Sequence, residues 1–146
     1  MCQKTISMCQ GKGSLSHNNR AFAAKNIDSF RTADNITFVH QNLRDAYDIL
    51  FSDAVERYNA RQKRNDRRIP DYFQHLFSRE PSASVITGTN KQKSFYEDLV
   101  QVGTKDDTGV GTPDSEIAVA CLREYMEGFS ERNPNFYVFN AVMHLD

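Results

Sequence analysis

Hydrophobic residues recur along the chain at two spacings, one of three to four residues and one of two. The wider spacing runs through residues 42–66 and predicts a long helix, which Asn42 is placed to cap. Its apolar positions are Leu43, Ala46, Tyr47, Leu50, Ala54 and Tyr58. Pro70 interrupts the pattern, and the aromatic-rich residues 71–78 predict a second, shorter helix. The middle of the chain is therefore predicted to be helical.

The helical spacing returns after a flexible polar connection at residues 103–111. Thr112 as cap, Pro113 at the first helical position and acids in the first turn predict the start of a third helix. Its apolar face consists of Ile117, Ala118, Cys121, Leu122, Tyr125, Met126 and Phe129. Asn133 and Pro134 end this helix and separate it from the last segment of the chain.

Strands are predicted at four places. Residues 4–8 are short and β-branched, residues 36–39 form another short strand, residues 95–102 alternate imperfectly, and residues 135–146 alternate with a period of two. Residues 80–94 predict a loop or a weak hairpin. An apolar face of the last strand, expected to pack under the helices, is formed by Tyr137, Phe139, Ala141, Met143 and Leu145. Its opposite face carries His144 and Asp146, which therefore leave the core together.

This order of strands and helices predicts an α+β fold. Because helices separate the strands, we expect a single sheet with helices on one face. The length of 146 residues suits one domain over residues 1–146. Hydrophobic residues make up 39% and charged residues 25%, which is typical of a globular domain.

The composition also bears on where the protein works. A mean hydropathy of −0.63 and the lack of a long apolar run exclude a membrane-spanning helix. The first fifteen residues hold no apolar core of a secretory signal, and Cys2, Cys9 and Cys121 have no CxxC spacing. We therefore expect free thiols and a cytoplasmic protein.

Positive charge gathers in one stretch, although the net charge is only −1. Asp66 is the one acid among the cations of residues 57–68, which are Arg57, Arg61, Lys63, Arg64, Arg67 and Arg68. Two interpretations stay open: a solvated helix end, which cations favour, or a patch that follows a phosphate backbone.

The four histidines differ in their neighbours. We assign no role to His40 or His75. His17 lies in SHNNR, three residues before Arg20, so an imidazole that can act as nucleophile or base stands near a guanidinium that binds phosphate. A polar turn at a helix start is the alternative. His144 and Asp146 suit the start of a metal site, but two ligands do not hold a divalent ion, and the spacing leaves this undecided.

Three stretches resemble, in order and spacing, the characteristic blocks of the plasmid mobilisation and recombination (Mob/Pre) proteins, relaxases of the MobV type. These are SHNNR at 16–20, AKNIDSFRTADNITFV at 24–39 and FNAVMHLD at 139–146; DRRIPDYF at 66–73 resembles one branch of the family. The resemblance covers nearly the whole chain. The family's last block reads H-x-D-E-x-x-P-H-x-H, so we expect a relaxase domain cut inside its metal motif.

The resemblance implies a DNA strand transferase that nicks one strand at a plasmid origin of transfer, stays covalently attached and later rejoins the ends. It implies a fold of the HUH relaxase kind, an antiparallel sheet flanked by helices. A divalent ion, Mn²⁺ or Mg²⁺, would polarise the scissile phosphate. The expected partners are single-stranded or hairpin DNA at the origin and the conjugation machinery, and the fragment is expected to be inactive alone.

The resemblance also assigns roles to residues. His17 matches the nucleophilic histidine, Arg20 the phosphate-binding arginine, and His144 and Asp146 the first metal-binding positions. Many members have a tyrosine after the asparagine that matches Asn35, and here Ile36 stands there, which strengthens His17 as the nucleophile. Residues expected to contact DNA are Arg20, Arg31, Asn35, Arg61, Lys63, Arg64, Arg67 and Arg68.

Two other hypotheses stay open. A noncatalytic DNA-binding module predicts salt-sensitive binding that His17→Ala does not change. A protein-interaction domain predicts no retention of DNA. The relaxase hypothesis makes a geometric demand that the others do not: His17 and His144 must share one cleft.

Overall fold

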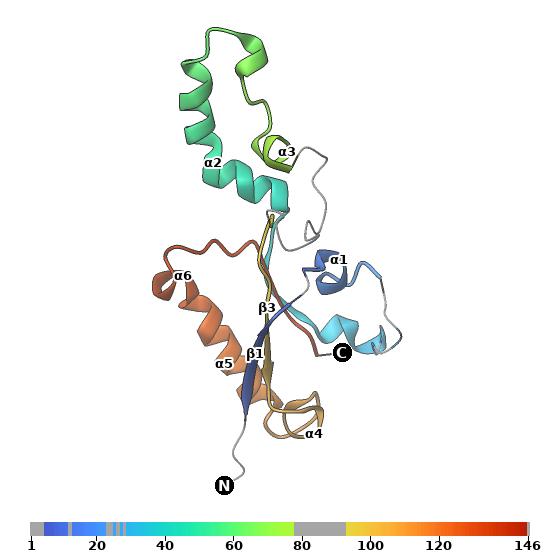
Figure 1. Cartoon of the computed structure of the whole chain (residues 1–146). Helices are drawn as coiled ribbons and strands as arrows, with labels where there is room; N and C mark the ends of the chain where they lie inside the picture. Colours follow the sequence, from blue (N-terminus) through green and yellow to red (C-terminus); the bar gives the residue numbers. More distant parts are fainter. Residues whose placement is uncertain are drawn as a thin grey trace. The chain divides into compact units, whose positions relative to one another are not determined.

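The computed structural model describes residues 5–11, 13–22, 25, 27, 29–77 and 93–145, with the backbone alone at residues 29–31 and 105 (Figure 1). The described chain is α+β, with two small antiparallel sheets flanked by helices. It divides into two compact units. Unit 1 comprises Met1–His40 and Tyr96–Asp146, and unit 2 comprises Gln41–Phe95.

Unit 1 contains all the strands of the described chain, and they form two separate pairs. Its elements are β1 (Ile6–Gln10), α1 (Leu15–Asn18), η1 (Ser29–Asp34), β2 (Ile36–His40), β3 (Asp98–Val102), α4 (Lys105–Thr108), α5 (Ser115–Glu127), α6 (Phe129–Arg132) and β4 (Asn140–Met143). β1 pairs with β3 and β2 pairs with β4, both antiparallel (Figure 1).

The prediction of one sheet is therefore wrong for the described residues. The strands themselves are confirmed near their predicted positions, but their partners lie far away in sequence, with Ile6 opposite Val102 and Ile36 opposite Met143. Local alternation cannot specify such pairing. β1 is also exposed along its whole length, so helices do not cover it as the single-sheet arrangement required.

The β2–β4 pair contains a bulge that matters for the site. Thr37 pairs with Val142 and Val39 with Ala141, so Phe38 is the extra residue on β2. A bulge shifts the alternation of side chains by one position. Thr37 and His40 consequently line the same cavity, although strict alternation would place them on opposite faces.

β4 is shorter than the predicted strand over residues 135–146. The chain turns before it, with the Phe136 amide donating to the carbonyl of Asn133 at 3.0 Å. Tyr137 precedes the strand and is 41% exposed, so it does not join an apolar face under the helices. Leu145, in contrast, does line an apolar cavity beside α5.

The third predicted helix exists but begins later than its sequence signals suggested. α5 starts at Ser115 with Asp114 as its N-cap residue, rather than at Pro113 after Thr112. The Thr112 hydroxyl donates to the carbonyl of Gly109 at 2.8 Å, so it closes a turn and does not cap a helix. Gly128 then ends α5, and the short α6 follows.

A short helix also lies inside the predicted flexible connection at residues 103–111. α4 begins with a capping box, in which Thr104 and Asp107 each bind the other's backbone amide. Gly103 precedes it at φ +62°, a backbone conformation that favours glycine. Propensity alone did not predict α4 because four residues give too short a window for a periodic signal.

Unit 2 consists of α2 (Leu43–Ala60), η2 (Asn65–Arg67) and α3 (Tyr72–Phe77). The predicted cap is confirmed, since the Asn42 side chain accepts from the Arg44 amide at 2.8 Å. The predicted end at residue 66 is wrong. Asn59 instead makes two hydrogen bonds of 2.8 Å to the backbone of Ile69, which close the basic residues between them into a loop.

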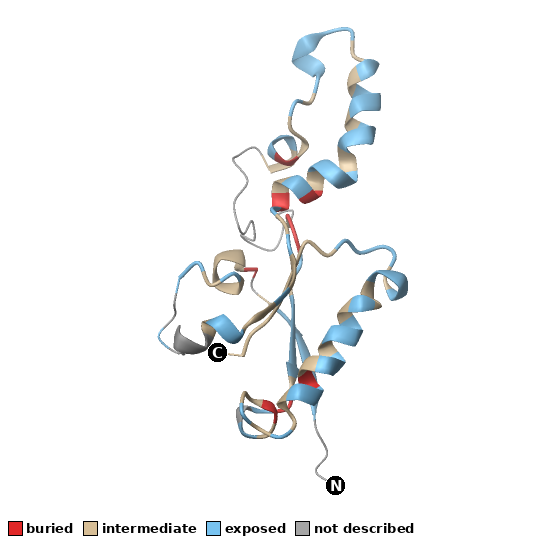
Figure 2. Ribbon diagram, turned by 180° about the vertical axis from the view of Figure 1, so that it is seen from behind, coloured by how far each residue is buried: buried red, intermediate tan, exposed pale blue. Residues whose placement is uncertain are grey.

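Burial is unequal between the two units (Figure 2). Buried hydrophobic residues of the described chain are Leu43, Ala46, Phe73 and Phe95 in unit 2 and Ala118 in unit 1.

Cys9 and Cys121 are exposed free thiols as predicted, whereas Cys2 lies outside the described residues. Among the described helices, none has the length and apolar character needed to cross a bilayer.

Candidate active site at His17 and His144

The two histidines expected to act together lie side by side in unit 1. The ring centroids of His17, in α1, and His144, just after β4, are 6.3 Å apart with the planes at 84°. The Nε2 atom of His144 lies 2.8 Å from the backbone oxygen of Asn18, 126 residues earlier in the chain. Because a carbonyl oxygen only accepts, this nitrogen carries the hydrogen. The two rings therefore converge, as the relaxase hypothesis requires, but the lining of the nearby polar cavity includes neither of them.

The short turn around α1 orients His17. Ser14 caps α1 and accepts from the His17 amide at 3.4 Å. Arg20 closes the turn in the left-handed region, at φ +52°. Both its backbone amide and its Nη1 atom donate to the His17 carbonyl, at 3.1 and 3.0 Å. This conformation costs a residue with a side chain about 1–2 kcal/mol, so the surrounding bonds must hold it.

A carboxylate that the sequence analysis did not single out anchors the same turn. Glu97 accepts from the amide of Gly13 at 2.8 Å and from the side-chain amide of Asn18. Its backbone carbonyl accepts from the amide of Gly11 at 2.9 Å. Glu97 comes directly before β3. Nothing in the surrounding sequence FYEDLV distinguishes it from an ordinary glutamate that faces solvent.

Two further asparagines fasten the segment that carries His144. Asn140 donates to the side-chain oxygen of Asn19 at 2.8 Å, which ties the start of β4 to the end of the α1 turn. Asn35 accepts from the Leu145 amide at 2.7 Å. The residues on both sides of His144 are therefore held to segments that are distant in sequence.

A polar cavity of about 280 Å³ opens at this network. Its lining residues are Asn18, Asn19, Arg20, Thr32, Asn35, Thr37, His40 and Val142. One arginine, three side-chain amides and two hydroxyls suit an anionic, hydrogen-bonding ligand better than an apolar one. His40, to which the sequence gave no role, belongs to this lining through the bulge in β2.

The structure brings together only part of the predicted site. His17, Arg20, Asn35 and His144 meet in unit 1, while Asp146 and the side chain of Arg31 lie outside the described residues. The remaining candidates belong to unit 2 and are all exposed: Arg61, Lys63, Arg64, Arg67 and Arg68.

The described residues do not complete a metal site. They contain no group of three histidine, cysteine or acidic side chains able to hold an ion. His144 is the one described member of the predicted metal pair, and its Nε2 atom already donates to Asn18. Binding of Mn²⁺ or Mg²⁺ stays a prediction.

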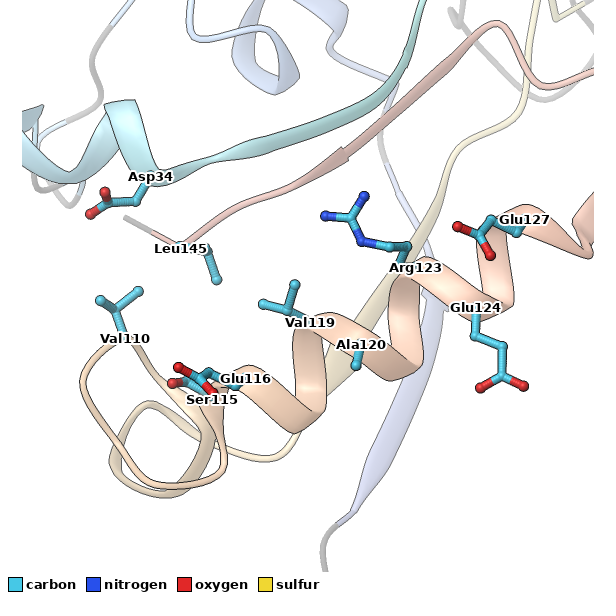
Figure 3. Close-up of a pocket in the computed structure, with 10 residues that line it drawn as sticks. All are labelled: Asp34, Val110, Ser115, Glu116, Val119, Ala120, Arg123, Glu124, Glu127 and Leu145. Carbon is cyan, nitrogen blue, oxygen red and sulfur yellow. The ribbon is translucent and has the colours of Figure 1, made fainter.

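A larger cavity of about 570 Å³ lies between α5 and the segment around Leu145. Figure 3 shows Val110, Val119 and Leu145 converging on it. The Arg123 guanidinium lies 5.9 Å from the centre of the Phe38 ring, so β2 presents this ring toward α5. Leu145 faces this cavity while His144 faces the polar network, as alternation along the last strand predicted.

The chain matches no known protein family, no curated protein and no solved structure in comparisons of sequence and fold. Membership of the Mob/Pre family therefore stays a prediction from the sequence blocks.

Proposed function

We propose that unit 1 is the catalytic part of a relaxase, a DNA strand transferase in which His17 attacks a phosphodiester. The observation that carries this proposal is the 6.3 Å approach of His17 and His144, with Arg20 bonded to the backbone of His17. The family resemblance supports it, because its first and last blocks contribute these three residues. On the same ground we assign the fold to the HUH relaxase kind.

The proposed reaction is an in-line displacement at phosphorus. The lone pair of the unprotonated His17 nitrogen forms a P–N bond, and the bond from phosphorus to one ester oxygen breaks. That oxygen takes a proton from water and leaves as the free hydroxyl end of the nicked strand, and the hydroxide formed takes the remaining N–H proton of the phosphorylated ring. The reverse reaction with a hydroxyl end rejoins the strand, which is what a strand transferase needs.

Arg20 supports this reaction through its charge. Its Nη1 atom lies 3.0 Å from the His17 carbonyl, so the guanidinium is next to the attacking residue. A fixed positive charge stabilises the additional negative charge that develops on the phosphoryl oxygens in the transition state. The side-chain amides of the cavity add hydrogen bonds to the nucleotide. These bonds position the strand but do not recognise its base sequence.

The decisive experiment detects the covalent intermediate. The gene product that contains residues 1–146 is incubated with labelled single-stranded oligonucleotides tiled over the DNA that flanks its gene, with Mn²⁺, Mg²⁺ or EDTA. We expect a protein–DNA adduct that survives denaturing gels and alkali but is lost in acid, because P–N bonds hydrolyse in acid. His17→Ala abolishes the adduct, whereas His75→Ala, at an exposed histidine of unit 2 outside the site, retains it. An adduct unchanged by His17→Ala contradicts the proposal.

A noncatalytic DNA-binding module is the second candidate. The exposure of the basic loop residues Arg61, Lys63, Arg64, Arg67 and Arg68 favours it. This candidate predicts retention of the same oligonucleotides that weakens steeply with salt, without any adduct, and equally for wild type and His17→Ala.

A further inference from the structure

We infer that Glu97 is a positioning residue, which holds Gly11, Gly13 and Asn18 so that Asn18 fixes the ring of His144 beside His17. The inference deepens the proposed function and takes its meaning from it. It concerns a residue outside every sequence block that resembles the relaxases.

Glu97 is bonded through three oxygen atoms to one short segment. Oε2 accepts from the Gly13 amide at 2.8 Å, Oε1 accepts from Nδ2 of Asn18, and the backbone carbonyl accepts from the Gly11 amide at 2.9 Å. The two side-chain contacts span 84 and 79 residues of sequence. An ionised carboxylate only accepts, and its hydrogen bonds are stronger than those between neutral groups. Glu97 thus clamps the start of β3 to both ends of the turn.

Asn18 transmits this clamp to His144. Its side-chain nitrogen donates to Glu97, while its backbone oxygen lies 2.8 Å from Nε2 of His144. With Nε2 carrying the hydrogen, the lone pair of the neutral His144 ring is on Nδ1. The clamp therefore fixes both the place and the tautomer of the ring that faces His17 at 6.3 Å.

The close approach of Gly11 independently supports a fixed position for the Glu97 side chain. A Cβ atom on residue 11 would lie 2.0 Å from Oε2 of Glu97 and 2.6 Å from its Cδ. Gly11→Ala would accordingly push the carboxylate out of its bonds while leaving its charge in the protein. The backbone of Gly11 is outside the left-handed region, so the substitution does not strain it. Glycine at position 11 is needed for space.

The matched variants separate position from charge. Glu97→Gln keeps the size of the side chain, but its NH₂ group faces a second donor and one of the two side-chain bonds is lost. Gly11→Ala displaces the carboxylate without removing it. Asp98→Asn removes the neighbouring charge, on an exposed residue that pairs with Gln10, and serves as the control.

The experiment measures ring tautomers and cleavage side by side on the same full gene product. Long-range ¹H–¹⁵N spectra report which ring nitrogen of His144 carries the hydrogen, and thermal melting checks that each variant is folded. We expect wild type and Asp98→Asn to show the Nε2–H form and Glu97→Gln and Gly11→Ala to show a mixture. Adduct formation should fall about 10–100-fold in the latter two, the usual cost of losing a hydrogen bond that orients a functional histidine.

The outcomes distinguish this inference from the proposed function. If both variants keep the wild-type tautomer and cleavage rate, Glu97 is not a positioning residue, whatever the reaction. If the tautomer changes but wild type forms no adduct with any oligonucleotide, the clamp stands and the relaxase proposal fails. If Glu97→Gln does not fold, Gly11→Ala decides the question, because it keeps the carboxylate.

Discussion

The two units of the chain are stabilised by different kinds of contact. In unit 2 the fully buried ring of Phe73 lies 5.0 Å from Tyr47 and 4.7 Å from Phe77, centre to centre. In the described part of unit 1 the one buried hydrophobic residue is Ala118. There the segments that carry the histidine pair are held by hydrogen bonds. Glu97 and the Asn18 carbonyl accept, from the Asn18 side chain and from His144, and Asn140 donates to Asn19.

The difference separates stability from position. Burial of one large apolar side chain stabilises a fold by about 1.5–3 kcal/mol, whereas a hydrogen bond adds only about 0.5–1.5 kcal/mol net. Hydrogen bonds, however, are directional and fix where a ring lies. We therefore expect substitutions in the aromatic core of unit 2 to change the free energy of unfolding, and substitutions around the histidines to change the reaction at nearly constant stability.

The largest effect on stability is expected for Phe73→Ala. Its side chain is 0% exposed, and removal of a buried phenyl group costs about 3–5 kcal/mol in the free energy of unfolding. Urea unfolding followed by circular dichroism measures the loss. Phe136→Ala is the matched control, since Phe136 is 67% exposed and lies in unit 1, and it should change stability by less than about 0.5 kcal/mol. Equal losses would show that Phe73 is not at the centre of a core.

The next effect concerns Arg20 and is expected in the reaction. Arg20→Ala removes the charge beside His17, and adduct formation should fall about 10²–10³-fold, the cost of one donor that stabilises transition-state charge. Arg20→Gly removes the same charge, but glycine adopts φ +52° without the penalty that a side chain brings. The free energy of unfolding of Arg20→Gly should therefore be about 1 kcal/mol higher than that of Arg20→Ala. An alanine variant that reacts at the wild-type rate contradicts the proposed role.

These residues also show what the sequence could predict. The start of α2 and the position of α3 depend on local signals, an asparagine cap and a three-to-four residue spacing, and both are confirmed. The end of α2 was missed because it depends on Asn59 bonding to Ile69, ten residues away. The pairing of the four strands into two separate sheets was missed for the same reason, because the local pattern of a strand does not specify which other strand it pairs with.

The site divides along the same line. The convergence of His17 and His144 was expected only through the family resemblance, and spacing in the sequence says nothing about it. Glu97 was missed because a glutamate before a strand is usually solvated, and its role depends on contacts with Gly13 and Asn18. The signal that could have drawn attention to it is Gly11, a glycine whose missing side chain makes room for the carboxylate.

A smaller effect is expected for Tyr47, and it depends on pH. Burial, with a contribution from Tyr72, raises the pKa of Tyr47 above its usual range. The neutral phenol is therefore favoured in the folded state, and this stability is present below about pH 10 and is lost as the pH rises through the folded pKa. Tyr47→Phe should remove this alkaline loss.

At neutral pH the same variant should cost about 0.5–1.5 kcal/mol, because the hydroxyl donates to the Ser94 carbonyl at 2.7 Å. Unfolding at pH 7 and at about pH 10.5 measures both effects. Tyr58→Phe is the control, since Tyr58 is 45% exposed. If wild type and Tyr47→Phe lose the same stability at high pH, the buried phenol is not responsible.

The smallest effect on stability is expected for the basic loop of unit 2, because its charged side chains are exposed and not packed in a core. Arg67 and Arg68 are exposed, so replacing both with glutamine should leave unfolding unchanged within about 0.5 kcal/mol. If they contact phosphates, the slope of log affinity against log salt should fall by about 1 per residue. Filter binding of labelled single-stranded DNA over a salt series measures this slope.

Arg64→Gln sharpens the same test. Arg64 already pairs with Asp66 through an Nη2–Oδ2 contact of 2.8 Å, so a phosphate has to compete with a neighbouring carboxylate for it. Its loss should consequently change the salt slope less than the loss of Arg67 or Arg68. Equal slopes for the double variant, Arg64→Gln and the wild type would mean that no phosphate is contacted by these three arginines of unit 2. Its cations would then be the solvated helix end that their position after α2 allows.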